Sequence, residues 1–284
     1  MKKTLLIAVM LIAATAGMQA QARMSGKQIV QPAITDTLEL ANYIVYYNIK
    51  TPDHKSSRPM VGELRIGNKY VLFQDYYQFK MDSVANHFAT LGKVKSQKYI
   101  EAQISVGMGK SNFEETVLRN VAADSVSTNC YILASGYICY REPSPAMDWQ
   151  VVPGDTIICG YECGKATLDF GGRHYVAWYA HELELPYGPY KFGGCPGLIV
   201  DLRDTAGDYS FAFAGIRKAD APAPIYLKAS YNGKTMPRDE YRRTVRNSKE
   251  NNSAILKDSG VEIIGADGKP RELPKREYSP IELE

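Results

Sequence analysis

The sequence predicts a mainly β fold: a single antiparallel sheet domain with short helical additions. Composition supports this, because twenty of the 284 residues are tyrosines, which favour strands. Short runs of β-branched and aromatic residues recur along the chain, and turn residues such as Gly67-Asn68 and Gly171-Gly172 separate several of them. The chain contains no internal repeat and no low-complexity tract, so one β domain over residues 23–235 is expected.

Residues 1–22 have the pattern of an export signal. Lys2 and Lys3 provide a basic start, an apolar run follows, and Ala20-Gln21-Ala22 is typical of a cleavage site. We expect cleavage near Ala22 and a periplasmic or secreted location. No later stretch approaches the ~20 continuous apolar residues that a membrane helix needs, so no transmembrane segment is expected in the mature chain.

The first half of the mature chain predicts strands around one helix. A strand is expected over 41–49, followed by a polar loop over 51–59. Apolar residues at helical spacing predict a short helix over 82–91. The other strands expected in this half cover residues 62–66, 70–76, 98–106, 113–121, 128–133 and 136–141.

The centre predicts a series of hairpins, with strands over 156–161, 164–170 and 173–182. If the turn at Gly171-Gly172 holds two or four residues, the flanking side chains pair in a defined way, whereas a three-residue turn would change every pair. The expected pairs are Asp169 with His174, Thr167 with Val176, Lys165 with Trp178 and Leu168 with Tyr175.

The next hairpin shows an alternating pattern. Residues 198–202 and 209–214 are expected to form two half-buried strands, with every second side chain in the core. The residues expected to point inward are Leu198, Val200, Leu202, Tyr209, Phe211 and Phe213.

The C-terminal region, 236–284, differs in character from the sheet domain. One more strand is expected over 225–231, and residues 237–250 are rich in cationic side chains and predict a solvated helix with almost no apolar stripe. Residues 265–284 contain several prolines and are expected to lie extended across the surface or to project into solvent.

A loop over 188–199 concentrates glycine and proline, which restrict its backbone to one shape. Tyr190, Lys191 and Phe192 are therefore held in fixed positions. Such a loop can serve as a recognition surface or as a tight corner in a sheet, and the sequence leaves both interpretations open.

Several motifs together resemble the GLPGLI family of exported Gram-negative envelope proteins. The resemblance includes the loop just described, and Cys195 stands where the name-giving motif has leucine. It implies an envelope location but no catalytic residues, because the family has no established activity. A looser similarity to the open half-barrels of periplasmic lipoprotein carriers implies a strongly curved sheet or open half-barrel. The matching segments are residues 66–70, 160–166, 172–179, 188–199 and 278–284.

The five cysteines permit at most two internal disulfides in an exported chain. Cys130 and Cys139 would face each other if residues 131–138 formed a hairpin centred on its middle pair. Cys159 and Cys163 could bond only if the chain turned between them. Spacing alone does not choose between these pairings.

Cysteine, histidine and glutamate residues in the centre of the chain are the candidates for catalysis or metal binding. A thiol-dependent periplasmic enzyme would use Cys195 activated by His174 or His181, but nothing in the spacing indicates that contact, and a small packed residue or a disulfide half is the favoured interpretation. On an unbroken strand His174 and His181 point to opposite faces, so they would not join Glu182 and Cys163 in one metal site. We therefore expect no catalytic residue, metal or cofactor.

Nucleic acid is not an expected partner. The net charge is +3, and the only basic cluster is Arg242, Arg243 and Arg246.

Binding without catalysis is the preferred function. Aromatic side chains of the sheet, together with the loop at its rim, are expected to contact an apolar or amphipathic, lipid-like ligand or an outer-membrane protein partner. The alternative is that these aromatics form the core. The predicted binding residues are Tyr190, Lys191, Phe192, Pro196, Trp178 and Tyr179.

Overall fold

A computed structural model of the chain describes ten ranges of residues, and the predicted export signal lies outside them. Most of the predicted loop over 51–59 also lies outside the described residues. The described ranges are 29–52, 60–93, 95–107, 113–132, 136–228, 235–258, 263, 269–273, 275 and 278–284.

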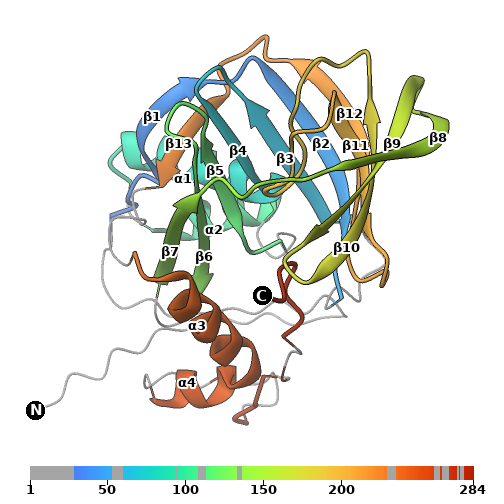
Figure 1. The fold of residues 1–284 in the computed structure, drawn as a ribbon. Coiled ribbons are helices and arrows are strands. Elements are labelled where there is room, and N and C mark those ends of the chain that lie inside the picture. Colours follow the sequence, from blue (N-terminus) through green and yellow to red (C-terminus); the bar gives the residue numbers. More distant parts are fainter. Residues whose placement is uncertain are drawn as a thin grey trace, which may run out of the picture.

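Eleven strands form one antiparallel sheet that curves strongly but does not close into a barrel (Figure 1), which confirms the predicted fold class. Its strands are β2 (Tyr43–Lys50), β3 (Met60–Ile66), β4 (Tyr70–Asp75), β5 (Thr116–Asn120), β6 (Ser125–Ile132), β7 (Gly136–Pro143), β8 (Gln150–Ile158), β9 (Tyr161–Phe170), β10 (Arg173–Ala180), β11 (Leu198–Asp204) and β12 (Ser210–Lys218). Their order across the sheet is β7-β6-β5-β4-β3-β2-β12-β11-β10-β9-β8.

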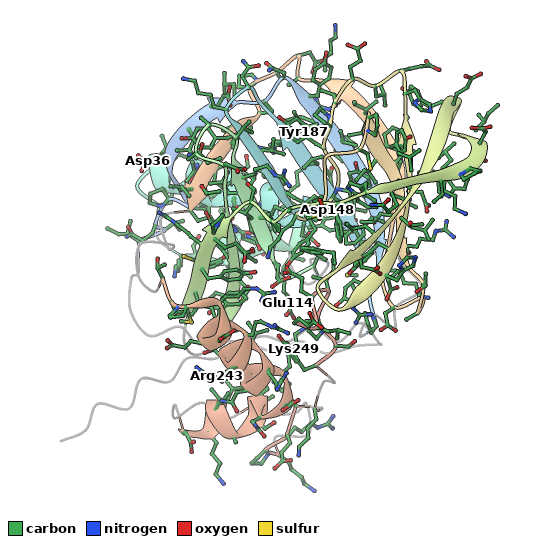
Figure 2. The ribbon with its side chains drawn as sticks, in the orientation of Figure 1. Asp36, Glu114, Asp148, Tyr187, Arg243 and Lys249 are labelled. Atoms are coloured by element: carbon green, nitrogen blue, oxygen red, sulfur yellow. The ribbon has the colours of Figure 1, made fainter. Side chains whose placement is uncertain are left out.

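The two edge strands, β7 and β8, follow each other in sequence. Residues 144–149 join them and cross the open side of the sheet, where Figure 2 shows Asp148. The indole N–H of Trp149 donates to the carbonyl oxygen of Gly193 at 2.8 Å, and its ring packs beside Phe192. The crossing segment therefore covers part of the concave side.

Large aromatic side chains fill the concave side of the sheet. They contact one another edge to face, as Phe73 does with Phe211 and Tyr175 does with Phe192. The predicted inward residues of β11 and β12 are all buried. The expectation that β11 is half-buried is wrong, however, because Ile199 is buried as well, with Gly188 packed over it.

A second layer covers the convex face over β2 to β5. It consists of the two-stranded sheet of β1 (Ile34–Leu40) and β13 (Pro224–Lys228) and of the helices α1 (Tyr76–Thr90) and α2 (Gln97–Val106). The buried cluster between the layers comprises Ala41, Ile44, Leu72, Phe79, Leu118, Ala223, Ile225 and Tyr226.

Two predictions in this region are wrong. Residues 98–106 form α2 and not a strand, because Ser96 caps the first turn by accepting from the Tyr99 N–H, and Tyr99 and Gln103 bond to each other one turn apart. The helix predicted over 82–91 is α1, which starts earlier because Asp75 accepts hydrogen bonds from the N–H groups of the first turn.

The central hairpin has the predicted register. Gly171 and Gly172 have φ values of 56° and 73°, so the two-residue turn requires left-handed backbone at both positions. All four predicted pairs are therefore confirmed, from Asp169 opposite His174 to Lys165 opposite Trp178.

The C-terminal helices pack more closely than expected. The sequence predicts a solvated helix for α3 (Arg238–Glu250), which precedes α4 (Asn252–Asp258), but Tyr241 and Val245 are buried one turn apart against β6 and β7. The Tyr241 ring lies 4.7 Å from that of Tyr140, and Lys249 forms an ion pair with Glu114 at 3.4 Å (Figure 2). The prediction of a solvated helix is wrong because Tyr241 and Val245, four residues apart, are enough to bury one face of it.

Within residues 278–284 of the predicted tail, Ile281 and Glu282 are buried, whereas Leu283 and Glu284 are exposed. The segment passes between the start of β10 and α3 (Figure 1), where Arg173 and Arg242 bind its carbonyl groups. No helix among the described residues is long and apolar enough to cross a membrane.

Candidate functional site

The loop over 188–199 turns into the concave side of the sheet. Tyr190, Lys191 and Phe192 are buried, so the prediction that they lie at an exposed rim is wrong. Tyr190 has a φ of 57°, which reverses the backbone, and the Phe192 ring packs 4.7 Å from that of Tyr175. The loop is therefore part of the core.

Gly197 fixes the end of this loop beside β10. Its φ is 151°, and a Cβ atom there would stand 2.1 Å from the carbonyl oxygen of Ala180. Only glycine permits this approach of two backbones.

Lys191 is the centre of a buried polar cluster. Its side chain is fully buried, and its Nζ lies 2.6 Å from carboxylate oxygens of both Glu142 and Glu282 and donates to the Tyr140 hydroxyl at 2.6 Å. Burial alone would lower the pKa of Lys191, but Glu282, Tyr140 and Glu142 raise it overall. The lysine is therefore a fixed cation that joins β7, the loop and the C-terminal segment.

Glu282 completes the cluster from the C-terminal segment. It accepts a hydrogen bond from the Tyr190 hydroxyl at 2.6 Å and pairs with Arg238 of α3 at 2.8 Å. Burial alone would raise the pKa of Glu282, but Lys191, Tyr190 and Arg238 lower it overall. Its matched charges indicate that the cluster stabilises the fold.

Of the six predicted binding residues, only Pro196 is exposed; Trp178 is half-buried, and Tyr179 is buried like the three loop residues. Trp178 lies on the convex face of β10, with the Lys165 ammonium 5.6 Å from its ring. It borders a shallow depression of about 350 Å³ whose lining residues are Thr156, Ile158, Val176, Trp178, Asp201 and Arg203.

The edge strand β8 borders this depression and carries exposed apolar side chains that sequence reasoning missed. Val151 is 62% exposed and Ile157 71% exposed. Pro153 and Gly154 lie between them, where the pairing with β9 shifts register. Proline within a strand is typical of a sheet edge, so a signal was present in the sequence.

Cys195 lacks the environment of a nucleophile. Burial raises the pKa of its thiol to about 12, whereas an activated cysteine needs a lowered pKa. His174 lies on the exposed face and bonds to Asp169 at 2.7 Å. These observations do not favour the thiol-dependent alternative.

All five cysteines are free thiols. Cys130 lies opposite Ile138 and Cys139 opposite Asn129, so the two cysteines point to opposite faces of the sheet. The hairpin pairing considered for them is wrong because the β6–β7 register places Ile132 opposite Gly136 and so offsets the two cysteines by one residue. Within the described ranges no three His, Cys, Asp or Glu side chains converge as metal ligands.

No family model and no curated protein matches the chain. Two solved structures of PNGF-II have a fold similar to that of part of this chain. The structure in space group P21 has a TM-score of 0.49 at 13% identity and covers 74% of this chain and 34% of that one. The structure in space group C2 has a TM-score of 0.47 at 14% identity and covers 73% and 33%. The chain thus spans about a third of the length of PNGF-II.

Proposed function

We propose that this chain is an exported cell-envelope protein that binds a protein partner without catalysing a reaction. The binding surface is the free edge of β8, to which an extended segment of the partner adds as a further strand. The observation that carries this proposal is the exposure of Val151 and Ile157 on a strand that has a neighbour, β9, on one side only among the described residues.

The depression beside Trp178 supports the same surface. An added strand supplies side chains on alternate faces, and those on the convex side would reach the depression. Trp178 and Val176 offer an apolar contact there, while Arg203 and its partner Asp201, 2.8 Å apart, form a polar border. Backbone hydrogen bonds would provide affinity, and the depression would provide specificity.

A small apolar or amphipathic ligand is less well supported, because aromatic side chains fill the concave side of the sheet. The predicted signal at residues 1–22 and the resemblance to an envelope family favour a partner in the cell envelope. An outer-membrane protein is therefore the first class of partner to test.

Photocrosslinking in the native cells tests this proposal. A photoreactive amino acid replaces Val151 or Ile157, and the matched control replaces Leu91, an apolar residue of similar exposure (53%) at the end of α1. We expect both β8 positions to capture the same protein and Leu91 to capture none. Capture from all three positions alike, from neither β8 position, or of a second copy of this chain alone would refute the proposal.

A further inference from the structure

The C-terminal segment Tyr278–Glu284 is held the way a binding site holds a peptide. It passes between the start of β10 and α3 (Figure 1), and side chains of the sheet and of α3 bind its backbone carbonyl groups one after another. The donors are Tyr209 to Ser279 (2.6 Å), Arg173 to Pro280 (3.0 Å), Tyr175 to Ile281 (2.7 Å) and Arg242 to Glu282 (3.1 Å).

Two side chains of the segment add specificity. Ile281 is buried within the main aromatic core, and Glu282 enters the cluster around Lys191 and Arg238. The N–H of Leu283 donates to the carbonyl oxygen of Gly171 at 2.6 Å. The site thus recognises an apolar side chain and, at the next position, a carboxylate. The hydrogen bonds to the backbone do not depend on the sequence of the segment.

The cations that hold the segment also have anionic partners in the body of the protein. Arg173 pairs with Asp204 at 2.6 Å and with Asp208 at 2.8 Å, and Lys191 pairs with Glu142 at 2.6 Å. If the segment leaves, these buried charges keep a counterion. The large penalty for an unpaired buried charge is then avoided, so the site can persist when empty.

From these contacts we infer that the side chains around the segment form a peptide-binding site whose resident ligand is the chain's own Tyr278–Glu284 segment. A segment of another protein with the same chemistry, a branched apolar residue followed by a glutamate, competes for it. This site is separate from the proposed β8 surface and does not depend on it.

Exchange of the segment is measurable with the full chain. The substitutions Ile281→Gly and Glu282→Gln weaken the internal ligand and leave the residues that bind it unchanged. The probe is a fluorescein-labelled peptide of sequence Tyr-Ser-Pro-Ile-Glu-Leu-Glu, followed by fluorescence anisotropy. We expect the doubly substituted protein to bind this peptide at least about tenfold more tightly than the wild-type protein, because its own segment competes less.

Two controls define the site. A peptide that carries the same two changes should bind at least about tenfold more weakly, and adding Tyr175→Phe to the protein should weaken binding of the unchanged peptide, because one carbonyl donor is lost. Equal binding of the probe by wild-type and substituted protein, or equal binding of the two peptides, would overturn the inference.

A thermal measurement covers the case in which the substituted protein is poorly folded. A ligand that binds only the folded state raises the unfolding temperature with its concentration. The unchanged peptide should therefore raise the Tm of the substituted protein, and the changed peptide should not. A Tm that responds to neither peptide contradicts the existence of the site.

Discussion

The two edges of the sheet are built differently although they follow each other in sequence. On β7, Thr235 forms a bridge with Cys139, the Met236 N–H donates to the Cys139 carbonyl oxygen at 2.9 Å, and α3 packs beside the strand. On β8, no described residue pairs with the outer side, and apolar side chains stand in solvent. One edge is thus committed to the fold, and the other is available for a partner.

Substitution of Lys191, which pairs with Glu142 of β7, should have the largest effect on the stability of the β7 edge. Lys191→Ala leaves the carboxylates of Glu142 and Glu282 without their central cation, so we expect the free energy of unfolding to fall by about 3–5 kcal/mol. Urea unfolding measures this loss. The matched control is Lys218→Ala, at an exposed position of β12, which should change stability by less than about 0.5 kcal/mol. Similar results for both variants would show that the cluster contributes little.

Tyr241 and Val151 compare the two edges directly. Tyr241→Ala removes a buried ring that holds α3 against β7, and we expect a loss of about 3 kcal/mol. Val151→Ala on β8 removes an exposed side chain and should cost less than about 0.5 kcal/mol. Chemical unfolding of both variants provides the comparison, and equal losses would remove the distinction between the edges.

Acid pH tests the charge at Glu282. A carboxyl whose pKa is lowered by folding stabilises the protein above its unfolded pKa of about 4.3, and this contribution is lost as the pH falls through the folded pKa. Wild-type protein should therefore be about 1–3 kcal/mol more stable than Glu282→Gln at pH 7, and the difference should shrink below about pH 5.

Unfolding of both proteins across this pH range gives the difference. Burial and the nearby charge of Glu282 raise the pKa of Glu115, which has the opposite effect on stability, so both proteins are compared in a Glu115→Gln background. A difference that stays constant as the pH falls would exclude the ion pair as its source.

The reactivity of two cysteine thiols compares the solvent accessibility of the two edges without a substitution. Cys159 is exposed in the turn between β8 and β9, whereas Cys139 is buried on β7. We expect iodoacetamide to modify Cys159 at least about tenfold faster than Cys139 in the folded protein, as measured by mass mapping. Cys159→Ser should remove the fast phase. Rapid modification of Cys139 would mean that the β7 edge opens readily.

Local rules account for what the sequence predicts correctly. The register of the β9–β10 hairpin depends on two adjacent glycines, and the inward pattern of β12 depends on alternation within one strand. The α2 helix was missed because aromatic and β-branched residues suggested a strand, while the cap at Ser96 and the pair Tyr99–Gln103 decided for a helix.

The candidate site depended on distant partners. Lysine is rarely buried unless it is paired, so Lys191 suggested an exposed rim. Its carboxylate partners are Glu142 of β7 and Glu282, about ninety residues further along the chain. No local sequence pattern predicts contacts between residues so far apart. The open edge was more accessible to prediction, since Pro153 marks it in the sequence.

The strand order divides the sheet into two meanders, β2 to β7 and β8 to β12, in which every strand pairs with its neighbour in sequence. Within this eleven-stranded sheet, only the seam between β2 and β12 joins strands from opposite ends of the strand order along the chain. Most neighbouring strands of a meander are joined by short turns, which lose little chain entropy on closing, although residues 76–115 separate β4 from β5 and residues 181–197 separate β10 from β11. We therefore expect the seam, the pairing of longest sequence separation in this sheet, to form after the hairpins within each meander.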